Sequence, residues 1–504
     1  MKKLYLFLLL VIITLRAEGQ TSDKVEHILQ KNYIPLHDET YTPYIAEGEG
    51  RILAIDATLP ERLQQALDSV FSGYADSVKR GVSACVIAPM IGVWTGNAGM
   101  SHETIPIASN MLFEIASITK TFTAALILQL SEEGKLSLTD PIGKWLPSLN
   151  NIDSLITIRE LLSQSSGVFD YWNDDTASTI LIQAEIQPSL FWSTDMLLEH
   201  VGAPRFHRGD SNLYSNTNYL ILGLIIESIT GNTYSDEIHS RFLEPLGLVN
   251  TFVGWDDSVT GEYSHQWIRS FLNQNAQLQD FGDSSRTAIL SQAHAAAGIV
   301  STPVDIARWG KAVYEGNSLL SSTSKSSMRT MKTWKNGMRY GLGTSQAYYG
   351  SKPFYGHTGS LPGYRTLMFN NIKDSVTICL YFNANVYTGD GLPNTFDFFA
   401  AFLNEIYKPA VSVPDKESAT LSVRAYPNPS YDNTTIIYSL PERSDIQLSL
   451  YNVIGEKVFV LTDQNASEGT HSVSIKTTNL PKGAYTYMLN SSGRIATGQV
   501  IVIH

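Results

Sequence analysis

Two residues, Ser117 and Lys120, have the types and the spacing that serine acyl transfer requires. Residues three apart in a helix lie about 60° apart around its axis and one turn apart along it, so both side chains share one face. The stretch that follows Ser117 is strongly apolar and stops at residues 132–134, where Gly134 occupies a plausible C′ position; such a helix is expected to be buried. Burial lowers the pKa of a lysine and lets a neutral amine accept a serine proton.

Two further short motifs could complete such a site. Tyr214-Ser215-Asn216 lies in a polar loop just before the apolar run 220–229, and His357-Thr358-Gly359 precedes strand-like segments. Taken singly, each motif is also compatible with an ordinary loop, and Ser-x-x-Lys with a capped helix start. Their order and separation along the chain are what favour a catalytic interpretation.

In that order the three motifs resemble the penicillin-recognising serine hydrolases, namely class C β-lactamases, DD-carboxypeptidases and related esterases. The resemblance covers about residues 59–407 and includes the further segments 157–167, 219–231, 243–248 and 295–305. It implies an α/β fold, in which helices flank an antiparallel sheet beside an all-α region. It also implies that no metal or other cofactor is needed.

The resemblance assigns roles residue by residue. Ser117 would form an acyl-enzyme, while Lys120 and Tyr214 would handle its proton; which of the two is the general base stays open. Asn216 would bind the substrate amide and the lysine. The remaining contacts would come from the backbone N–H groups of Ser117 and Ser360 as an oxyanion hole, and from Thr358 and Gly359 as the strand edge along which substrate lies.

One position departs from the class C pattern, because His357 stands where those enzymes usually carry lysine. A histidine titrates near pH 6.5, so His357 would be a switchable cation for a substrate carboxylate, and activity would fall as the pH rises through its pKa. Tyr-Ser-Asn with His-Thr-Gly resembles the DD-carboxypeptidase pattern. We therefore expect a serine acyl-hydrolase that acts on D-alanyl peptide amides or small esters; the alternatives are a class C-like β-lactamase and a non-catalytic binding protein that keeps the fold.

The elements that must position these residues mix helix and strand. Residues 61–78 form an amphipathic pattern, whereas 81–88 and 375–383 are rich in strand-forming residues. An antiparallel sheet with helices and an all-α region follows from this order of elements. Cys85 and Cys379 lie in the two strand-like segments, which are neighbours in the family fold. Buried thiols and a cross-strand disulfide both remain open.

The sequences at the two ends of the chain predict that the protein is exported. A basic start, a twelve-residue apolar stretch and a small-residue exit predict a secretory signal peptide, cleaved near Gly19. Beyond a polar, proline-bearing linker, short alternating strands predict a small all-β sandwich. That segment resembles the C-terminal sorting domain of the type IX secretion system, through Tyr426-Pro427-Asn428-Pro429 and residues 451–455 and 480–485. It implies secretion machinery as a partner, and a Gram-negative producer that carries the protein through the periplasm to its surface or beyond.

The predicted organisation is therefore a signal peptide (1–19), an N-terminal extension (20–58), a β-lactamase-like hydrolase domain (59–408), a linker (409–422) and a sorting domain (423–504). Composition agrees with it: 36 basic against 48 acidic residues give a net charge of −12, which disfavours nucleic acid as a partner. Two cysteines in 504 residues exclude a disulfide-stapled scaffold or a multi-cysteine metal site. The apolar stretch of the signal peptide is too short to span a bilayer as a helix, and no other segment is long and apolar enough, so no membrane span is expected in the mature chain.

Overall fold

The computed structural model describes residues 44–45, 58–74, 80–173, 177–270, 277–316, 318–385, 394–408, 421–426, 428, 430, 433–452 and 456–503. The predicted signal peptide and most of the predicted N-terminal extension and linker lie outside these residues. Contacts divide the chain into two compact units, Met1–Lys408 and Pro409–His504, and each is described by itself.

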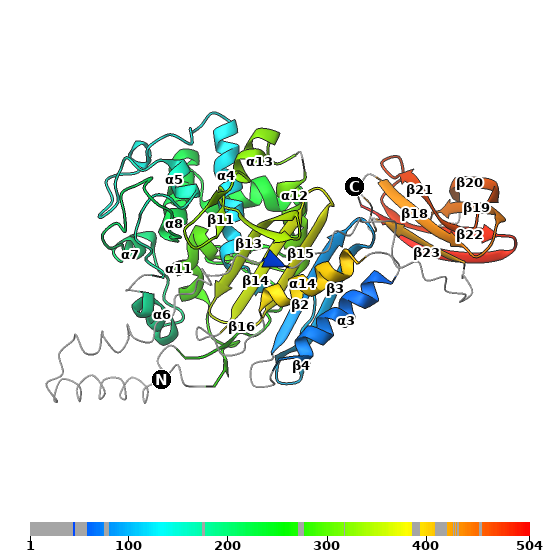
Figure 1. Cartoon of the computed structure of the whole chain (residues 1–504), viewed down its shortest axis with the longest axis horizontal. Coiled ribbons are helices and arrows are strands. Elements are labelled where there is room, and N and C mark those ends of the chain that lie inside the picture. Colours follow the sequence, from blue (N-terminus) through cyan, green and yellow to red (C-terminus); the bar gives the residue numbers. More distant parts are fainter. Residues whose placement is uncertain are drawn as a thin grey trace. The chain divides into compact units, whose positions relative to one another are not determined.

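A largely antiparallel sheet forms the centre of the first unit (Figure 1). Its strands lie in the order β10-β11-β12-β13-β14-β15-β2-β3-β4, and β1 pairs in parallel with β12. Their bounds are β1 (Tyr44–Ile45), β2 (Gly81–Ala88), β3 (Gly92–His102), β4 (Ile105–Pro106), β10 (Lys332–Thr333), β11 (Arg339–Tyr340), β12 (Ser345–Tyr349), β13 (Lys352–Leu361), β14 (Tyr364–Asn371) and β15 (Val376–Phe382).

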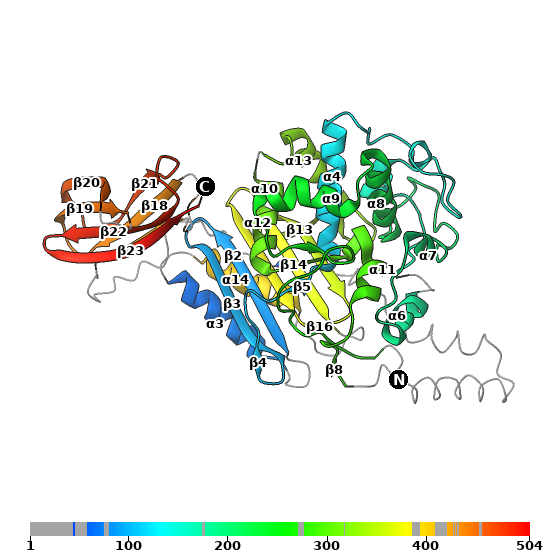
Figure 2. The ribbon, with the colours of Figure 1, turned by 180° about the vertical axis from the view of Figure 1, so that it is seen from behind.

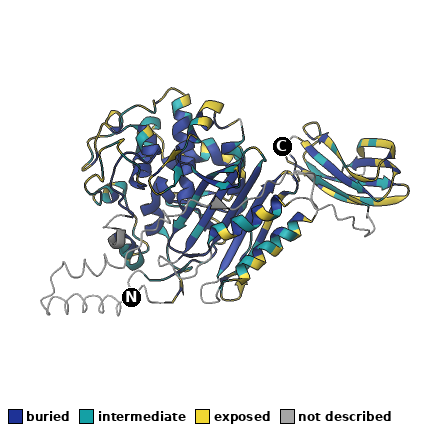
Figure 3. Ribbon diagram, in the orientation of Figure 1, coloured by how far each residue is buried: buried dark blue, intermediate teal, exposed yellow. Residues whose placement is uncertain are grey.

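Strand β2 shows how the sheet is buried on both faces. All its residues are buried, and alternate side chains enter two different cores, Val82, Ala84 and Val86 on one side and Cys85 and Ile87 on the other. This follows from the two-residue period of a strand. Figure 3 shows the central strands as buried along most of their length.

Helices cover both faces of the sheet. Helices α3 and α14 contribute to the core on one face and lie in front of the sheet in Figure 1, while the view from behind in Figure 2 shows α4, α8, α11 and α12 on the other. The helix bounds are α3 (Leu59–Ser72), α4 (Thr119–Glu132), α5 (Ile158–Leu162), α6 (Ala177–Ile186), α7 (Thr194–Leu198), α8 (Thr217–Thr230), α9 (Tyr234–Ile238), α10 (Glu244–Leu246), α11 (Thr287–Ala297), α12 (Pro303–Tyr314), α13 (Ser322–Met328) and α14 (Thr395–Ile406).

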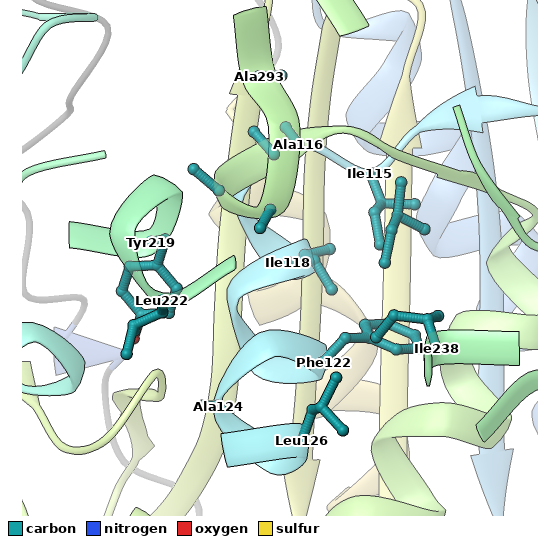
Figure 4. Packing of buried hydrophobic residues seen from close by; sticks show 14 of the residues in the cluster. Ile115, Ala116, Ile118, Phe122, Ala124, Leu126, Tyr219, Leu222, Ile238 and Ala293 are labelled. Atoms are coloured by element: carbon teal, nitrogen blue, oxygen red, sulfur yellow. The ribbon is translucent and has the colours of Figure 1, made fainter. Parts of the chain in front are cut away.

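Helix α4 lies in the middle of the larger core. Figure 4 shows Ile118, directly before this helix, and Phe122 and Leu126 on it, among apolar side chains from other elements. Phe122 stacks on Trp309 of α12 with ring centroids 3.8 Å apart. Because every residue of α4 from 119 to 128 is buried, a charged side chain on this helix is held away from water.

The predicted elements are present with small shifts. The amphipathic helix expected over 61–78 is α3, which has Pro60 in its first turn and ends at Ser72 before Gly73. The helix after Ser117 ends at Glu132 as expected, and Gly134 has a left-handed φ of 72°. Both predicted strands are present as β2 and β15.

The two cysteines lie directly opposite each other in the sheet. Cys85 on β2 pairs in register with Cys379 on β15, and both are fully buried free thiols. Burial and the neighbouring sulfur raise the pKa of Cys379 well above its usual value. The two thiols are therefore held as neutral, apolar side chains.

The second unit consists of β strands in two small sheets, β17-β18-β21 and β20-β19-β22-β23. Side chains from both sheets share one apolar core, which confirms the small all-β fold expected for this segment. The strand bounds are β17 (Ser422–Tyr426), β18 (Asn433–Leu440), β19 (Ser444–Tyr451), β20 (Lys457–Ala466), β21 (Gly469–Lys476), β22 (Gly483–Ser491) and β23 (Arg494–Val502). Within the described parts of both units, no helix has the length and hydrophobicity that a membrane crossing requires.

Candidate active site

Ser117 lies on a short 3-10 turn, η1 (Ala116–Ile118), directly before α4. The preceding residue, Ala116, has φ of 51°, in the left-handed region that non-glycine residues rarely adopt. The turn is held from the sheet side, since Thr366 Oγ1 donates to the Ile115 carbonyl oxygen at 2.8 Å. Ser117 itself is 8% exposed and lines a cleft.

A buried ion pair anchors the strand that leads into this turn. Arg286 donates from Nε and one Nη to the two carboxylate oxygens of Glu114 at 2.5 and 2.6 Å, and also to the Pro362 carbonyl oxygen at 3.0 Å. Glu114 is three residues before Ser117, and Pro362 two residues after Ser360. The pair therefore ties together the two segments that carry Ser117 and Ser360.

Lys120 is fully buried, and its Nζ lies within hydrogen-bond distance of three oxygen atoms. These are Ser117 Oγ at 3.1 Å, Asn216 Oδ1 at 2.7 Å and the Ala296 carbonyl oxygen at 3.0 Å. Burial lowers the pKa of Lys120 to about 7, and the nearby charge of Asp170 opposes that shift. Both protonation states of this lysine are accessible near neutral pH.

The three partners of Lys120 differ in what they can do. Asn216 Oδ1 and the Ala296 carbonyl only accept, whereas the Ser117 hydroxyl can accept or donate. A charged ammonium donates to all three. A neutral amine donates its two protons to the two obligatory acceptors, which leaves its lone pair facing the Ser117 hydroxyl.

Tyr214 lies on the other side of the lysine. Its ring centroid is 4.7 Å from Lys120 Nζ, and the ring packs in a buried aromatic cluster with Trp334 and Tyr340. Asn216 is the residue directly before α8, and Tyr214 lies two residues earlier, so a single short segment places both side chains beside the lysine.

Strand β13 passes close to the turn that holds Ser117. A Cβ at Gly359 would lie 2.4 Å from the Ile115 carbonyl oxygen and 2.9 Å from Ala116 Cβ, so only glycine permits this approach. Thr358 and Ser360 flank Gly359 on the strand and line the same cleft as Ser117. The structure therefore brings together all eight residues that the sequence nominates.

His357 is the one whose expected chemistry the structure contradicts. It is 4% exposed, and its Nδ1 lies 2.5 Å from the Thr358 carbonyl oxygen, which requires Nδ1 to carry the proton. Its Nε2 lies 3.1 Å from the Tyr340 hydroxyl and accepts from it in the neutral tautomer. Burial, reinforced by the positive charge of Lys120, lowers the pKa of His357 to about 3. The prediction of a cation that titrates near pH 6.5 is therefore wrong.

The cleft over Ser117 has cationic and aromatic walls that the motifs did not indicate. Arg339 on β11 and Arg365 on β14 line it, together with Trp172, Phe369 and Phe396. Arg365 pairs across the sheet with Ser360, a register that a sequence without a known sheet cannot reveal. Within the described ranges, no three His, Cys, Asp or Glu side chains lie close enough together to hold a metal ion.

Asp170 is a further residue that the sequence analysis did not nominate. It is 3% exposed and accepts from Asn216 Nδ2, at 3.3 Å on Oδ1 and 3.1 Å on Oδ2. In the sequence, the only indication of its role was its position shortly after segment 157–167, which is part of the family resemblance. The Ala296 contact is made by a backbone carbonyl, so the residue type at this position gives no indication of it.

Comparison with known proteins gives two family matches and a consistent set of relatives. The profile of the family described as Beta-lactamase matches residues 67–401, and the profile described as Secretion system C-terminal sorting domain matches residues 424–503. Penicillin-binding protein 4* of Bacillus subtilis (strain 168) is 29% identical over 291 residues, which is 56% of this chain and 63% of that protein. The match thus spans less than two thirds of this curated relative.

Two solved structures are similar over the first unit. D-amino acid amidase from Ochrobactrum anthropi SV3, complexed with D-phenylalanine, has a TM-score of 0.62 and 25% identity and covers 70% of this chain and 100% of its own. D-stereospecific amidohydrolase from Streptomyces sp. has a TM-score of 0.59 and 28% identity and covers 68% and 97%.

The geometry around His357 leads to a first prediction. We expect its imidazole signals in a histidine-selective NMR spectrum, assigned by their loss in His357→Gln, to stay unchanged between pH 5 and 8, because burial and Lys120 keep the ring neutral. A titration midpoint between pH 6 and 7 for these signals would contradict the neutral ring and support the cationic histidine expected from the sequence.

Proposed function

We propose a function from the premise that this chain belongs to the beta-lactamase family, whose profile spans residues 67–401. The chain is a serine hydrolase of that family, with penicillin-binding proteins and D-amino acid amidases among its relatives. The finer proposal is an exported serine acyl-hydrolase that works through an acyl-enzyme on Ser117. Its substrates are D-alanyl peptide amides and small esters that carry a carboxylate.

The observation that carries this proposal is the hydrogen bond between Lys120 Nζ and Ser117 Oγ, 3.1 Å long and fully buried. When the amine is neutral, its lone pair faces the hydroxyl and takes its proton as Ser117 Oγ bonds to the substrate carbonyl carbon. The carbonyl π electrons move to oxygen, and the backbone N–H groups of Ser117 and Ser360 stabilise that oxyanion by about 3–4 kcal/mol for one donor.

Collapse of the tetrahedral intermediate breaks the bond to the leaving group, which needs a proton. Lys120, now charged, holds that proton, and the Tyr214 hydroxyl is the group we assign to pass it on. Water then attacks the acyl carbon while Lys120 takes its proton. The bond between the acyl carbon and Ser117 Oγ breaks, and Lys120 returns that proton to Oγ, which restores the free serine and the neutral amine. Lys120 is the general base in this scheme because its pKa of about 7 suits proton transfer near neutral pH.

The cleft supports an anionic substrate. Arg339 and Arg365 line it, and no acidic side chain lines it among the described residues. Arg339 Nε is buried and lacks a hydrogen-bond acceptor within the described structure, so a bound carboxylate would supply one. Since His357 is neutral, we assign carboxylate recognition to these guanidinium groups. A C-terminal D-alanine presents such a group, and a free amino acid amide does not.

Export is supported by the C-terminal segment. Residues 424–503 match the sorting-domain family and form the small all-β unit, which we propose brings the enzyme through the periplasm to the cell surface or the medium. The retained Ser117, Lys120 and Asn216 contacts argue against a non-catalytic binding protein, since such a protein would not need a buried lysine aimed at a serine.

The enzyme assignment is tested with a fluorescent penicillin and a short acyl ester. We expect wild type and Ser131→Ala to be labelled and to turn over the ester, and Ser117→Ala to do neither, because only Ser117 can form the acyl-enzyme. Ser131 lies on the same helix and serves as the matched control. If neither labelling nor turnover depends on Ser117, the hydrolase proposal is wrong.

The pH dependence has a defined sign. Lys120 acts as a base only when neutral, so kcat/KM for an ester should rise about tenfold per pH unit below its pKa of about 7 and level off above it. A kcat/KM profile measured from pH 5 to 9 checks this. Activity that falls between pH 5.5 and 8 would contradict the lysine-base mechanism.

Carboxylate recognition is tested with two matched peptides, one ending in D-Ala-D-Ala and one in its C-terminal carboxamide. We expect Arg339→Gln to raise KM for the first by roughly 10- to 100-fold, since a hydrogen bond to a charged group contributes about 1.5–3 kcal/mol. KM for the carboxamide should change little, and Lys332→Gln, an exposed cation on β10, should affect neither. Equal losses on both peptides would refute this role for Arg339.

A further inference from the structure

We propose that Asp170 is a positioning residue of the active site: it holds the Asn216 side chain with its carbonyl oxygen toward Lys120, so that the lysine lone pair faces Ser117. The inference rests on the proposed function, in which Lys120 must be neutral and correctly directed. Asp170 acts through Asn216, and no contact between Asp170 and substrate is required.

The orientation of Asn216 follows from what its two neighbours can accept and donate. A carboxylate only accepts hydrogen bonds, so Asp170 selects the Nδ2 end of the Asn216 amide. The Oδ1 end then faces Lys120 Nζ at 2.7 Å. A flipped amide would place its oxygen against the carboxylate, which is repulsive, and its N–H against Lys120. There the N–H would repel the ammonium or, with the neutral amine, donate to the lone pair that must face Ser117.

Asp170 is itself held firmly. Its Oδ1 accepts from the Trp172 backbone N–H at 3.0 Å, and its Oδ2 accepts from Asn173 Nδ2 at 2.8 Å. Both oxygens of this buried carboxylate therefore accept hydrogen bonds from its own loop as well as from Asn216. The segment that contains Asp170 also contacts α8, because Thr217 Oγ1 donates to the Phe169 carbonyl oxygen at 2.6 Å. The carboxylate therefore cannot swing away from Asn216 without breaking several hydrogen bonds.

The consequence for Lys120 is geometric. With Asn216 Oδ1 and the Ala296 carbonyl fixed as acceptors, the lysine has one remaining direction, which points to Ser117 Oγ. If Asn216 were free to flip, a neutral Lys120 would lose one acceptor and could turn a proton, instead of its lone pair, toward the serine. Asp170 thus acts on the nucleophile through three successive hydrogen bonds, from Asp170 to Asn216, from Asn216 to Lys120 and from Lys120 to Ser117.

Charge reinforces this arrangement. The ionisable side chains that surround Lys120 are Tyr214 from the loop before α8, Tyr219 from α8, His357 from β13, and Asp170 from the loop that follows α5. His357 is neutral, and burial raises the pKa of Tyr219 well above its usual value. Among these groups Asp170 is therefore the anion that favours the charged form of Lys120, and its charge opposes the larger lowering of the lysine pKa by burial.

The test compares Asp170→Asn with Asp170→Glu and with Asp305→Asn. Asp305 is an equally buried carboxylate (1% exposed) that accepts from the Asn250 backbone N–H and from Thr251, away from Lys120, and so controls for the loss of a buried charge. For each folded variant, kcat/KM on the ester is measured from pH 5 to 9. The Lys120 titration is followed separately by NMR on chains labelled with [ε-13C]lysine, with the signal assigned by its loss in Lys120→Arg.

Asp170→Asn should move the acidic limb and the Lys120 midpoint to lower pH by 0.5 to 1 unit, because the charge that favours the ammonium is gone. It should also lower plateau kcat/KM about tenfold. Asp170→Glu and Asp305→Asn should keep the wild-type midpoint. Unchanged midpoints in Asp170→Asn, or equal activity losses in Asp170→Asn and Asp170→Glu without any shift, would show that Asp170 only holds its own loop.

Two further outcomes are covered. If Asp170→Asn does not fold, the wild-type chain decides: the Asn216 carboxamide protons, assigned through Asn216→Asp, should exchange slowly with deuterium and shift as Lys120 titrates, and free exchange would overturn the inference. If wild type lacks Ser117-dependent turnover, the proposed function fails, while the lysine titration still decides the role of Asp170.

Discussion

The burial of one amine constrains the rest of this site. Lys120 is fully buried on α4, where an ammonium without acceptors would be costly. The protein meets that cost with oxygen atoms from three separate segments: Ser117, Asn216 and the Ala296 carbonyl. Each must be placed to within hydrogen-bond distance, so η1, the start of α8 and the end of α11 are fixed relative to one another. The same burial that makes the lysine expensive is what lowers its pKa and gives it catalytic use.

Much of this arrangement could be predicted from local sequence patterns. Ser117 and Lys120 are three residues apart, and this spacing predicted that they meet on one side of the chain, although Ser117 lies on the turn η1 and only Lys120 on α4. The strand-forming residues of 81–88 and 375–383 likewise predicted β2 and β15, and the family resemblance predicted that these two strands are neighbours. The residues whose role is indicated by the sequence motif around them were therefore predicted.

Other features depend on pairings between distant segments, and these were missed. Arg365 lines the cleft because β14 pairs with β13 in one particular register, and Arg339 because β11 lies beside β12. Asp170 matters because a loop after α5 meets the start of α8. His357 was found, but its protonation was mispredicted, since its residue type carries no information about the Tyr340 hydroxyl or the Thr358 carbonyl that fix its tautomer.

The position of β2 beside β15 also has a consequence for how the enzyme matures. Val82 pairs with Phe382, so the centre of the sheet joins segments about 300 residues apart in sequence. Contacts between residues so far apart in sequence form late, because the entropic cost of closing the long loop between them precedes the stabilisation that the contacts provide. The turn of Ser117 packs on β13, which belongs to the late half of this sheet. A nascent or partly translocated chain therefore contains the nucleophile long before it can use it, and the catalytic lysine gains its environment only when nearly the whole unit has been made.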